Sequence, residues 1–460
     1  MVLNKCLALL FSVMILGQAY LVRRHVGTWL FPSCIFGLFW FGYTFFPLAV
    51  LFWVPVQPYG VAFIFICTVA FSMAAMVFDW KTAFERNAQK RGTATVVYGN
   101  SFLKALFYIS TISSLLFLAL NSFAQGFSLR DLLFDLYASA AAYAEMRYSQ
   151  DLSSNAFNPL SIIFTYMGVI LGGLLFPSME TKIGRCIVLV LSFLPSILVA
   201  VTQSAKGLLF LCVVFFYAGL LVYRASEGTL RLFKKGNIKW LMIFMAVLIS
   251  TVTISFVSGG LYKIEDVESL AGELISRFAT YALGHLYAFS DWFAFVVGIH
   301  SDVIYSHEGA THGFYTFAPL FKLLGSHKVL PLGNFDDIYS FGDLINTNIF
   351  TMFRGLIQDF GIIGSVLFML LTGFLFHWAF RTMLLKRVPV FTVGIFVLMM
   401  GYFYLSFGIS LLISNSIYVT FFLTWIILQS NKLIAERSGR LLPRSQVPTI
   451  AAAGHGILQS

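Results

Sequence analysis

The sequence predicts an all-α, polytopic integral membrane protein, and three observations lead to that prediction. First, 59% of the 460 residues are hydrophobic and only 11% are charged. Soluble domains carry about 25% charged residues, so a soluble enzyme is excluded. Second, the chain contains eleven apolar stretches, and a helix needs roughly 20 apolar residues to cross the hydrocarbon core. Third, the mean hydropathy is +0.85, which excludes intrinsic disorder because disordered chains are poor in apolar residues.

We expect 11 membrane-spanning helices, and we interpret a further apolar piece at about 278–299 as non-spanning. Gly284, His285 and Asp291 interrupt that piece, and an ionisable group at mid-bilayer is costly. A crossing there would also invert the sidedness of everything downstream, so short or re-entrant helices are expected instead. The first stretch is followed by Arg23-Arg24 rather than by a cleavage site, and we keep it as a helix. The expected spans are 4–22, 29–54, 60–79, 102–124, 159–177, 186–202, 207–223, 240–258, 356–380, 389–408 and 412–430.

The net charge of +10 is divided unequally between the two faces of the predicted bundle. When alternate loops are placed on opposite sides, one side holds 21 basic and five acidic residues, and the other holds nine basic and 15 acidic residues. The positive-inside rule makes the first side cytoplasmic, so the tail 431–460 is cytoplasmic and the N-terminus lies outside. The excess charge is then an orientation signal, which removes the nucleic-acid partner that a basic soluble protein would suggest.

We treat residues 1–460 as a single membrane domain with two long outer segments. One is 125–158, and the other is the large loop 259–355, which carries five of the eight histidines of the chain. Any chemistry is therefore expected at the outer side of the membrane, chiefly in the large loop.

One block at the end of the large loop combines polar residues and glycines in a distinctive order. Asn348 and Thr351 precede the run Asp359-Phe360-Gly361, and Gly364 and Gly373 follow it. This block resembles the "N…T.F…DFG..G…G" signature of the oligosaccharide repeat-unit polymerases, the O-antigen (Wzy-type) polymerases.

Three other stretches resemble motifs of the same family, namely Tyr281–Phe289, Gly126–Leu129 and Thr202–Gly207. The last of them departs from the family pattern, because Lys206 stands where Arg is common. Arg grips a phosphate with two parallel hydrogen bonds, whereas Lys acts as a point charge.

The resemblance implies a metal-independent glycosyltransferase of the bacterial inner membrane with no cofactor. The growing glycan would move from undecaprenyl diphosphate to a sugar hydroxyl of another lipid-linked repeat unit at the periplasmic face. Donor, acceptor and bilayer are then the partners, and a chain-length regulator and a flippase can join them. Two alternatives stay open: a ligase that moves the glycan to lipid A core, and a flippase or other transporter. Transporters usually show internal repeats and intramembrane charges, and the sequence shows no repeat.

Such a reaction needs cations for the diphosphate, and basic residues are scarce on the outer side. We predict Arg277, Arg354 and Lys206 as diphosphate ligands, because they stand near bilayer level; the alternative is an anchor that reaches up to the lipid headgroups. The nine outer cations are Lys5, Arg130, Arg147, Lys206, Lys263, Arg277, Lys322, Lys328 and Arg354.

The reaction also needs a base for the acceptor hydroxyl, and imidazole titrates near the working pH. We favour His312, with His285 and Asp291 behind it; surface or packing roles are the alternative for each. The large loop also offers His300, Asp302, His307 and Glu308. The spacing of His300, His307 and His312 lacks a recognisable zinc pattern, so no metal site is predicted.

Asp359 is expected to act locally, either by capping a helix or by pairing with Arg354 five residues earlier. Gly361, Gly364 and Gly373 are expected to allow close packing between helices, as small residues do in membranes.

Overall fold

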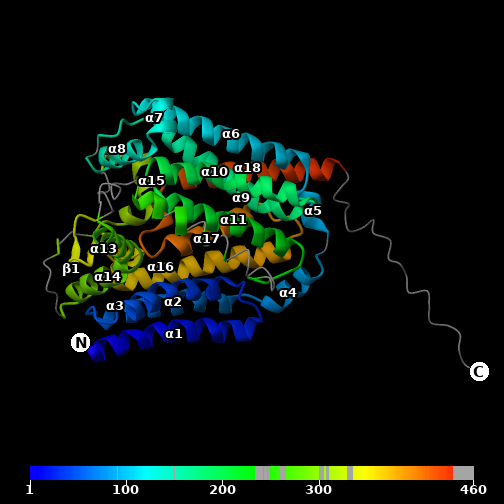
Figure 1. Ribbon diagram of the computed structural model, residues 1–460. Helices are drawn as coiled ribbons and strands as arrows, with labels where there is room; N and C mark the ends of the chain where they lie inside the picture. The colour runs from blue at the N-terminus through cyan, green and yellow to red at the C-terminus, as the bar shows by residue number, and fades with distance from the viewer. Residues whose placement is uncertain are drawn as a thin grey trace, which may run out of the picture.

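The computed structural model is a mostly helical bundle in which long helices run side by side (Figure 1). It describes residues 1–90, 92–149, 151–233, 242, 246, 249–251, 253–257, 266–299, 305–306, 310–328 and 335–438.

Nine of the described helices are long and apolar enough to cross a membrane, which supports the predicted membrane class. Seven of the spans come before the large loop: α1 (Val2–Val26), α2 (Pro32–Val50), α3 with its 3₁₀ extension η1 (Pro58–Met73, Ala74–Val77), α6 (Ser101–Ala124), α9 with η2 (Phe157–Leu175, Phe176–Ser178), α10 (Lys182–Thr202) and α11 (Lys206–Ser226). Two follow it, α16 (Met352–Leu385) and α18 (Asn415–Arg437), and α17 (Phe391–Leu405) is apolar but shorter.

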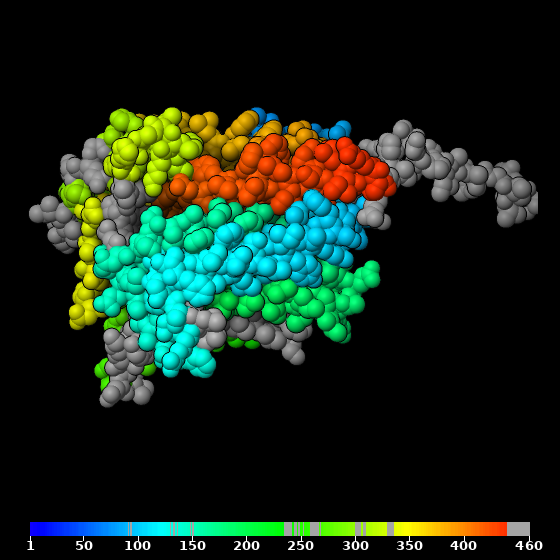
Figure 2. All heavy atoms as spheres, turned by 90° about the horizontal axis from the view of Figure 1, so that it is seen from above, coloured from blue at the N-terminus to red at the C-terminus, as the bar shows by residue number. Residues whose placement is uncertain are grey.

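The short elements gather at the two ends of the bundle. One end, which we call the loop end, carries the N-terminus, α7 (Leu129–Phe134), α8 (Leu136–Tyr148), α13 (Val267–Phe278), α14 (Gly284–Val296) and α15 (Phe314–Leu323) (Figure 1). The opposite end, which we call the basic end, carries α4 (Trp80–Ala88), α5 (Thr93–Tyr98) and the end of α18. The space-filling view shows α18 in orange and red along one face, with α6 beside it and α15 in lime towards the loop end (Figure 2).

The predicted non-spanning piece 278–299 forms α14 and the π-helical turn η4 (Ala279–Leu283) before it. α14 has 13 residues, about 20 Å at 1.5 Å per residue, and the piece is not among the described helices that are long and apolar enough to cross. Most of the predicted span 240–258 lies outside the described residues. Leu230 before it accepts a hydrogen bond from Thr28, which precedes α2 at the basic end, at 2.6 Å.

A small hairpin departs from the predicted all-α class. β1 (Tyr339–Phe341) and β2 (Ile345–Thr347) pair antiparallel, with Tyr339 opposite Thr347. Gly342 supplies the positive φ of 50° in the turn. The helices of this chain could be predicted from their long apolar runs. Two strands of three residues are too short to show the alternation of apolar and polar residues that predicts a strand.

α16 contains a break that the apolar pattern does not reveal. Gly361 has φ 71° and ψ 177°, so the helix bends there. The predicted packing role of Gly361 is wrong, because nothing lies within 4 Å of an added Cβ; its role is the positive φ. At Gly364 an added Cβ would meet only Phe360 of the same helix, at 2.8 Å, so the packing prediction fails there too. It is confirmed for Gly373, where the Cβ would stand 2.3 Å from the Phe71 carbonyl oxygen of α3.

Replacing Gly373 by Ala is expected to destabilise the bundle by about 1–3 kcal/mol, since α16 must move away from the backbone of α3. Thermal unfolding of the purified protein in detergent measures the effect. Gly17→Ala is the matched control, because nothing lies within 4 Å of its added Cβ. A Gly373→Ala protein that melts with the control would contradict this account of the α3–α16 contact.

Candidate functional site

Lys206 is the first residue of α11, directly after the tight turn between α10 and α11 at the loop end. The turn has only three residues between the two helices, and Ser204 within it has a positive φ of 50°. The Lys206 ammonium group donates to the Ser204 carbonyl oxygen at 3.5 Å and lies 4.3 Å from the centre of the Phe256 ring. The side chain is half-buried, so the turn holds a cation at the rim of the bundle.

Arg147 brings a second cation to this turn from α8. Its guanidinium donates to the Gln203 carbonyl oxygen at 2.7 Å and lies 5.4 Å from the Tyr143 ring centre. Gln203 itself is 4% exposed, and its side-chain Nε2 has no hydrogen-bond partner among the described residues. A buried amide donor without a partner is costly. A bound anion could accept a hydrogen bond from Gln203 as well as interact with the positive charges at this turn.

Arg277, near the end of α13, is the third cation. It is close enough to Lys206 for the two positive charges to repel, and so is Arg147. Phe278 and Phe256 are in edge contact at 5.2 Å, which brings α13 against the aromatic ring below Lys206. Arg277 also pairs with Glu273 at 3.0 Å.

We call Lys206, Arg147 and Arg277 the cation cluster. Among the described residues, neither Lys206 nor Arg147 has an acidic partner. Like charges gathered without counter-charges are unfavourable, and such an arrangement suits an anion. Two of the three predicted diphosphate ligands are therefore brought together. Arg147 belongs to the nine cations predicted on the outer side but not to the predicted ligands, because its contact with Gln203 joins residues 56 positions apart.

Arg354, the other predicted diphosphate ligand, lies elsewhere and is 1% exposed. It forms an ion pair with Asp337, and its guanidinium carbon stands 4.1 Å from the centres of both the Phe335 and the Phe350 ring. The predicted pairing with Asp359 is therefore wrong: Asp337, 17 positions away in the large loop, takes that place.

Asp291 and Tyr305 extend the surroundings of Arg354. The Tyr305 hydroxyl donates to Asp291 at 2.6 Å, and its ring centre is 5.9 Å from the Arg354 guanidinium. Burial, together with the hydrogen bond to Asp291, raises the pKa of Tyr305 well above its ordinary value. Burial alone would raise the pKa of Asp337, but the Ser306 amide and Arg354 hold it below its usual value.

His285 is fully buried in α14, where its Nε2 lies 3.2 Å from the Tyr43 carbonyl oxygen of α2. Its ring packs against Phe407 and Tyr43. Burial lowers the pKa of His285 to about 4, so the imidazole is neutral at physiological pH. These contacts give it a packing role between α14 and α2.

His312, in contrast, is exposed just before α15. It has a positive φ of 52°, and Gly313 after it has φ 101°. Asp359 of α16 accepts hydrogen bonds from the residues on either side, Thr311 and Tyr315 among them. Asp359 thus accepts from the amide of the second residue of α15, 44 positions away, whereas the predicted role was local to its own helix. No contact joins His312 to the cation cluster among the described residues.

Two non-glycine residues of the described chain have positive φ, and they are Ser204 and His312. Such conformations cost roughly 1–3 kcal/mol and persist where the surroundings over-determine them, often at functional sites. Three hydrogen bonds to the Asp359 carboxylate, at about 1.5–3 kcal/mol for a bond to a charged group, outweigh that cost at His312. Both strained positions fall in segments that the sequence singled out.

Replacing His312 by Gly is expected to raise the free energy of unfolding by about 0.5–1 kcal/mol. Relief of the left-handed conformation, roughly 1–2 kcal/mol, exceeds the extra chain entropy of Gly, about 0.5–1 kcal/mol. Chemical denaturation in detergent measures it. His327→Gly is the control, because His327 is also exposed and lacks a positive φ; it should be neutral or destabilising. Equal effects at the two positions would contradict the strain at His312.

The remaining predicted residues are distributed as follows. Thr351 is the buried N-cap residue just before α16, and Asn348 is half-buried after β2. Lys5 is buried and donates to the Leu51 carbonyl oxygen and the Tyr287 hydroxyl, so it links α1 to α2 and α14. Arg130, Lys322 and Lys328 are exposed. His300, Asp302, His307, Glu308 and Lys263 lie outside the described residues.

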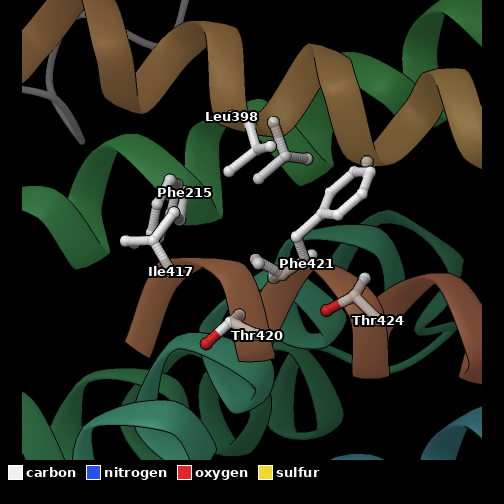
Figure 3. Close-up of a pocket in the computed structure, with 9 residues that line it drawn as sticks. Phe215, Leu398, Ile417, Thr420, Phe421 and Thr424 are labelled. Carbon is white, nitrogen blue, oxygen red and sulfur yellow. The ribbon is translucent and has the colours of Figure 1, made fainter. Parts of the chain in front are cut away.

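A crevice between α9, α11, α17 and α18 offers no room for a lipid-linked sugar. It is lined by Phe215, Leu398, Ile417, Thr420 and Phe421 (Figure 3). The space that a water-sized sphere could occupy in it is about 10 Å³, roughly one water molecule. The candidate site is instead the loop end, where the cation cluster gathers three positive charges. In the part of the chain that the structure describes, no three His, Cys, Asp or Glu side chains are grouped as metal ligands would be.

Comparison with known proteins adds no relative to these observations. No protein family, no curated protein and no solved structure matches this chain.

Proposed function

We propose that the protein is a polymerase of lipid-linked oligosaccharide repeat units, with its site at the loop end. The observation that supports it is the cation cluster: Lys206, Arg147 and Arg277 converge from α11, α8 and α13 at the rim of an apolar bundle. In this proposal the diphosphate of a membrane lipid is the anion that the cluster binds, with its polyprenyl chain among the spanning helices. The resemblance of the block around Asp359 to the polymerase signature supports the type of reaction.

The proposed step forms one bond and breaks one. The hydroxyl oxygen of the acceptor sugar attacks the anomeric carbon of the donor glycan, and the bond from that carbon to the diphosphate oxygen breaks. The cation cluster stabilises the charge that develops on the departing undecaprenyl diphosphate. His312, the exposed imidazole of the loop end, takes the hydroxyl proton and returns it to water. We do not assign Arg354 to the diphosphate, because it is buried and paired with Asp337.

Reconstitution tests this function directly. The purified protein in nanodiscs, given lipid-linked repeat units, should build a ladder of longer lipid-linked glycans without nucleotide or metal. A protein that only moves these lipids across a vesicle membrane would leave them unextended, and the transporter alternative would then hold.

A deletion strain separates the polymerase from the ligase. Without the polymerase, the lipid A core carries one repeat unit; without the ligase, it stays bare. Bare core in the deletion strain would overturn the proposed function in favour of the ligase.

A further inference from the structure

The Asp359 carboxylate holds the segment that carries His312 against the N-terminal part of α16, just before the bend at Gly361. Asp359 is 3% exposed, and both of its oxygens are engaged. Oδ1 accepts from the Thr311 hydroxyl at 2.5 Å and from the Tyr315 amide at 3.0 Å, and Oδ2 accepts from the Thr316 hydroxyl at 2.6 Å. His312 therefore lies inside a turn whose two sides bind one carboxylate.

The main chain supports the same connection. The Thr311 amide donates to the Gln358 carbonyl oxygen at 3.0 Å, and the bend at Gly361 follows two residues after Asp359. Because the segment is docked through both a side chain and the main chain, His312 is kept at its positive φ of 52°. The backbone conformation at His312 is thus imposed from α16.

Asp359 itself is poorly suited to meet a substrate. Its oxygens are occupied by three donors and it is almost fully buried, whereas His312 beside it is exposed. Its effect on a reaction at the loop end must therefore pass through the residue that it holds.

We propose that Asp359 is the positioning residue of the site, which fixes His312 where it can accept the proton of the incoming sugar hydroxyl. The proposal rests on the proposed function, since it needs His312 as the base. A misplacement of about 1 Å in a catalytic group can cost roughly 100-fold in rate.

A double-mutant cycle on the elongation of lipid-linked repeat units tests the proposal. Asp359→Asn should lower the elongation rate about 10- to 100-fold, with little change in KM. In the His312→Ala background the same change should cost less than about twofold, because residues that act as a unit are not additive. Damage to the fold alone would cost the same factor in both backgrounds.

Two further variants guard against misfolding. Thr311→Val and Thr316→Val each remove one donor and should show smaller losses with the same dependence on His312. Asp131→Asn is the matched control, since Asp131 also caps a loop-end helix, α7, through Ser128; its rate should stay within about twofold of wild type. Hydrogen exchange at the Tyr315 amide should rise in Asp359→Asn and not in the control.

The outcomes distinguish a failure of the positioning role of Asp359 from a failure of the proposed polymerase function. A cost of Asp359→Asn that persists undiminished without His312, or wild-type elongation by Asp359→Asn when His312→Ala is impaired, overturns the positioning role alone. Full elongation by His312→Ala rejects both the base and the positioning role. No elongation by the wild type rejects the proposed function itself, and the positioning role with it.

Discussion

Replacing Lys206 by Gln is expected to lower the rate of glycan elongation by about 10²- to 10³-fold, the usual cost of removing one group that stabilises charge in a transition state. Lys206 lies close to two other cations, Arg147 and Arg277. Because Lys206 has no acidic partner among the described residues, the diphosphate would be its counter-ion. The initial rate with purified lipid-linked repeat units measures the effect. Lys206→Arg should keep most of the activity, since it retains the charge.

The companion variants fix the interpretation of that result. Arg147→Gln and Arg277→Gln should each lower the rate, and Arg277 the less, because Glu273 already neutralises part of its charge. Arg130→Gln removes an exposed loop-end cation outside the cluster and should leave the rate within about twofold. If Lys206→Gln and Arg130→Gln elongate alike, the cation cluster is not the diphosphate site.

The membrane class and the positions of most spans could be predicted from sequence because each depends on a local run of apolar residues. The same local pattern concealed the bend at Gly361, since the residues that follow it, from Ile362 onward, are mainly apolar. The apolar pattern also overestimated the length of α17, which ends at Leu405 rather than near residue 408. A bend set by the positive φ of a single glycine leaves no mark in the hydropathy of the chain.

The candidate site was predicted in part, for a related reason. Lys206 and Arg277 could be selected because cations are rare on the predicted outer face. Arg147 could not be ranked above the other outer cations, because its place depends on a contact between α8 and the turn after α10. The true partner of Arg354 could not be predicted for the same reason: Asp337 lies in the irregular part of the large loop, where no periodicity indicates which residues meet.

Removing Asp337 is expected to destabilise the protein by about 3–5 kcal/mol, the cost of leaving a buried charge without its partner. Arg354 is 1% exposed and would keep its charge among the rings of Phe335, Phe350 and Trp292. Denaturation of Asp337→Ala in detergent measures the loss. Lys432→Gln, which breaks the half-exposed pair with Glu436, is the control and should cost less than about 1 kcal/mol.

The ion pair between Asp337 and Arg354 should also make the stability of the protein depend on pH. The pKa of Asp337 is lower in the folded protein than its ordinary value, so its contribution is complete above about pH 4 and is lost as the pH falls through the folded pKa. Asp337→Asn should lack this part of the acid sensitivity. An unchanged acid profile in Asp337→Asn would show that the ion pair contributes little.

A double replacement, Arg354→Met with Asp337→Leu, separates a structural role of Arg354 from the diphosphate role that its sequence position predicts. Apolar residues of similar volume can replace a buried ion pair at little or no cost in stability, so the double variant should melt within about 1 kcal/mol of wild type. If Arg354 only holds the loop, this folded variant should elongate glycans at close to the wild-type rate, whereas Asp337→Ala alone should not. A stable double variant that has lost elongation would return Arg354 to the diphosphate and would place the departing lipid near Trp292 rather than at Lys206.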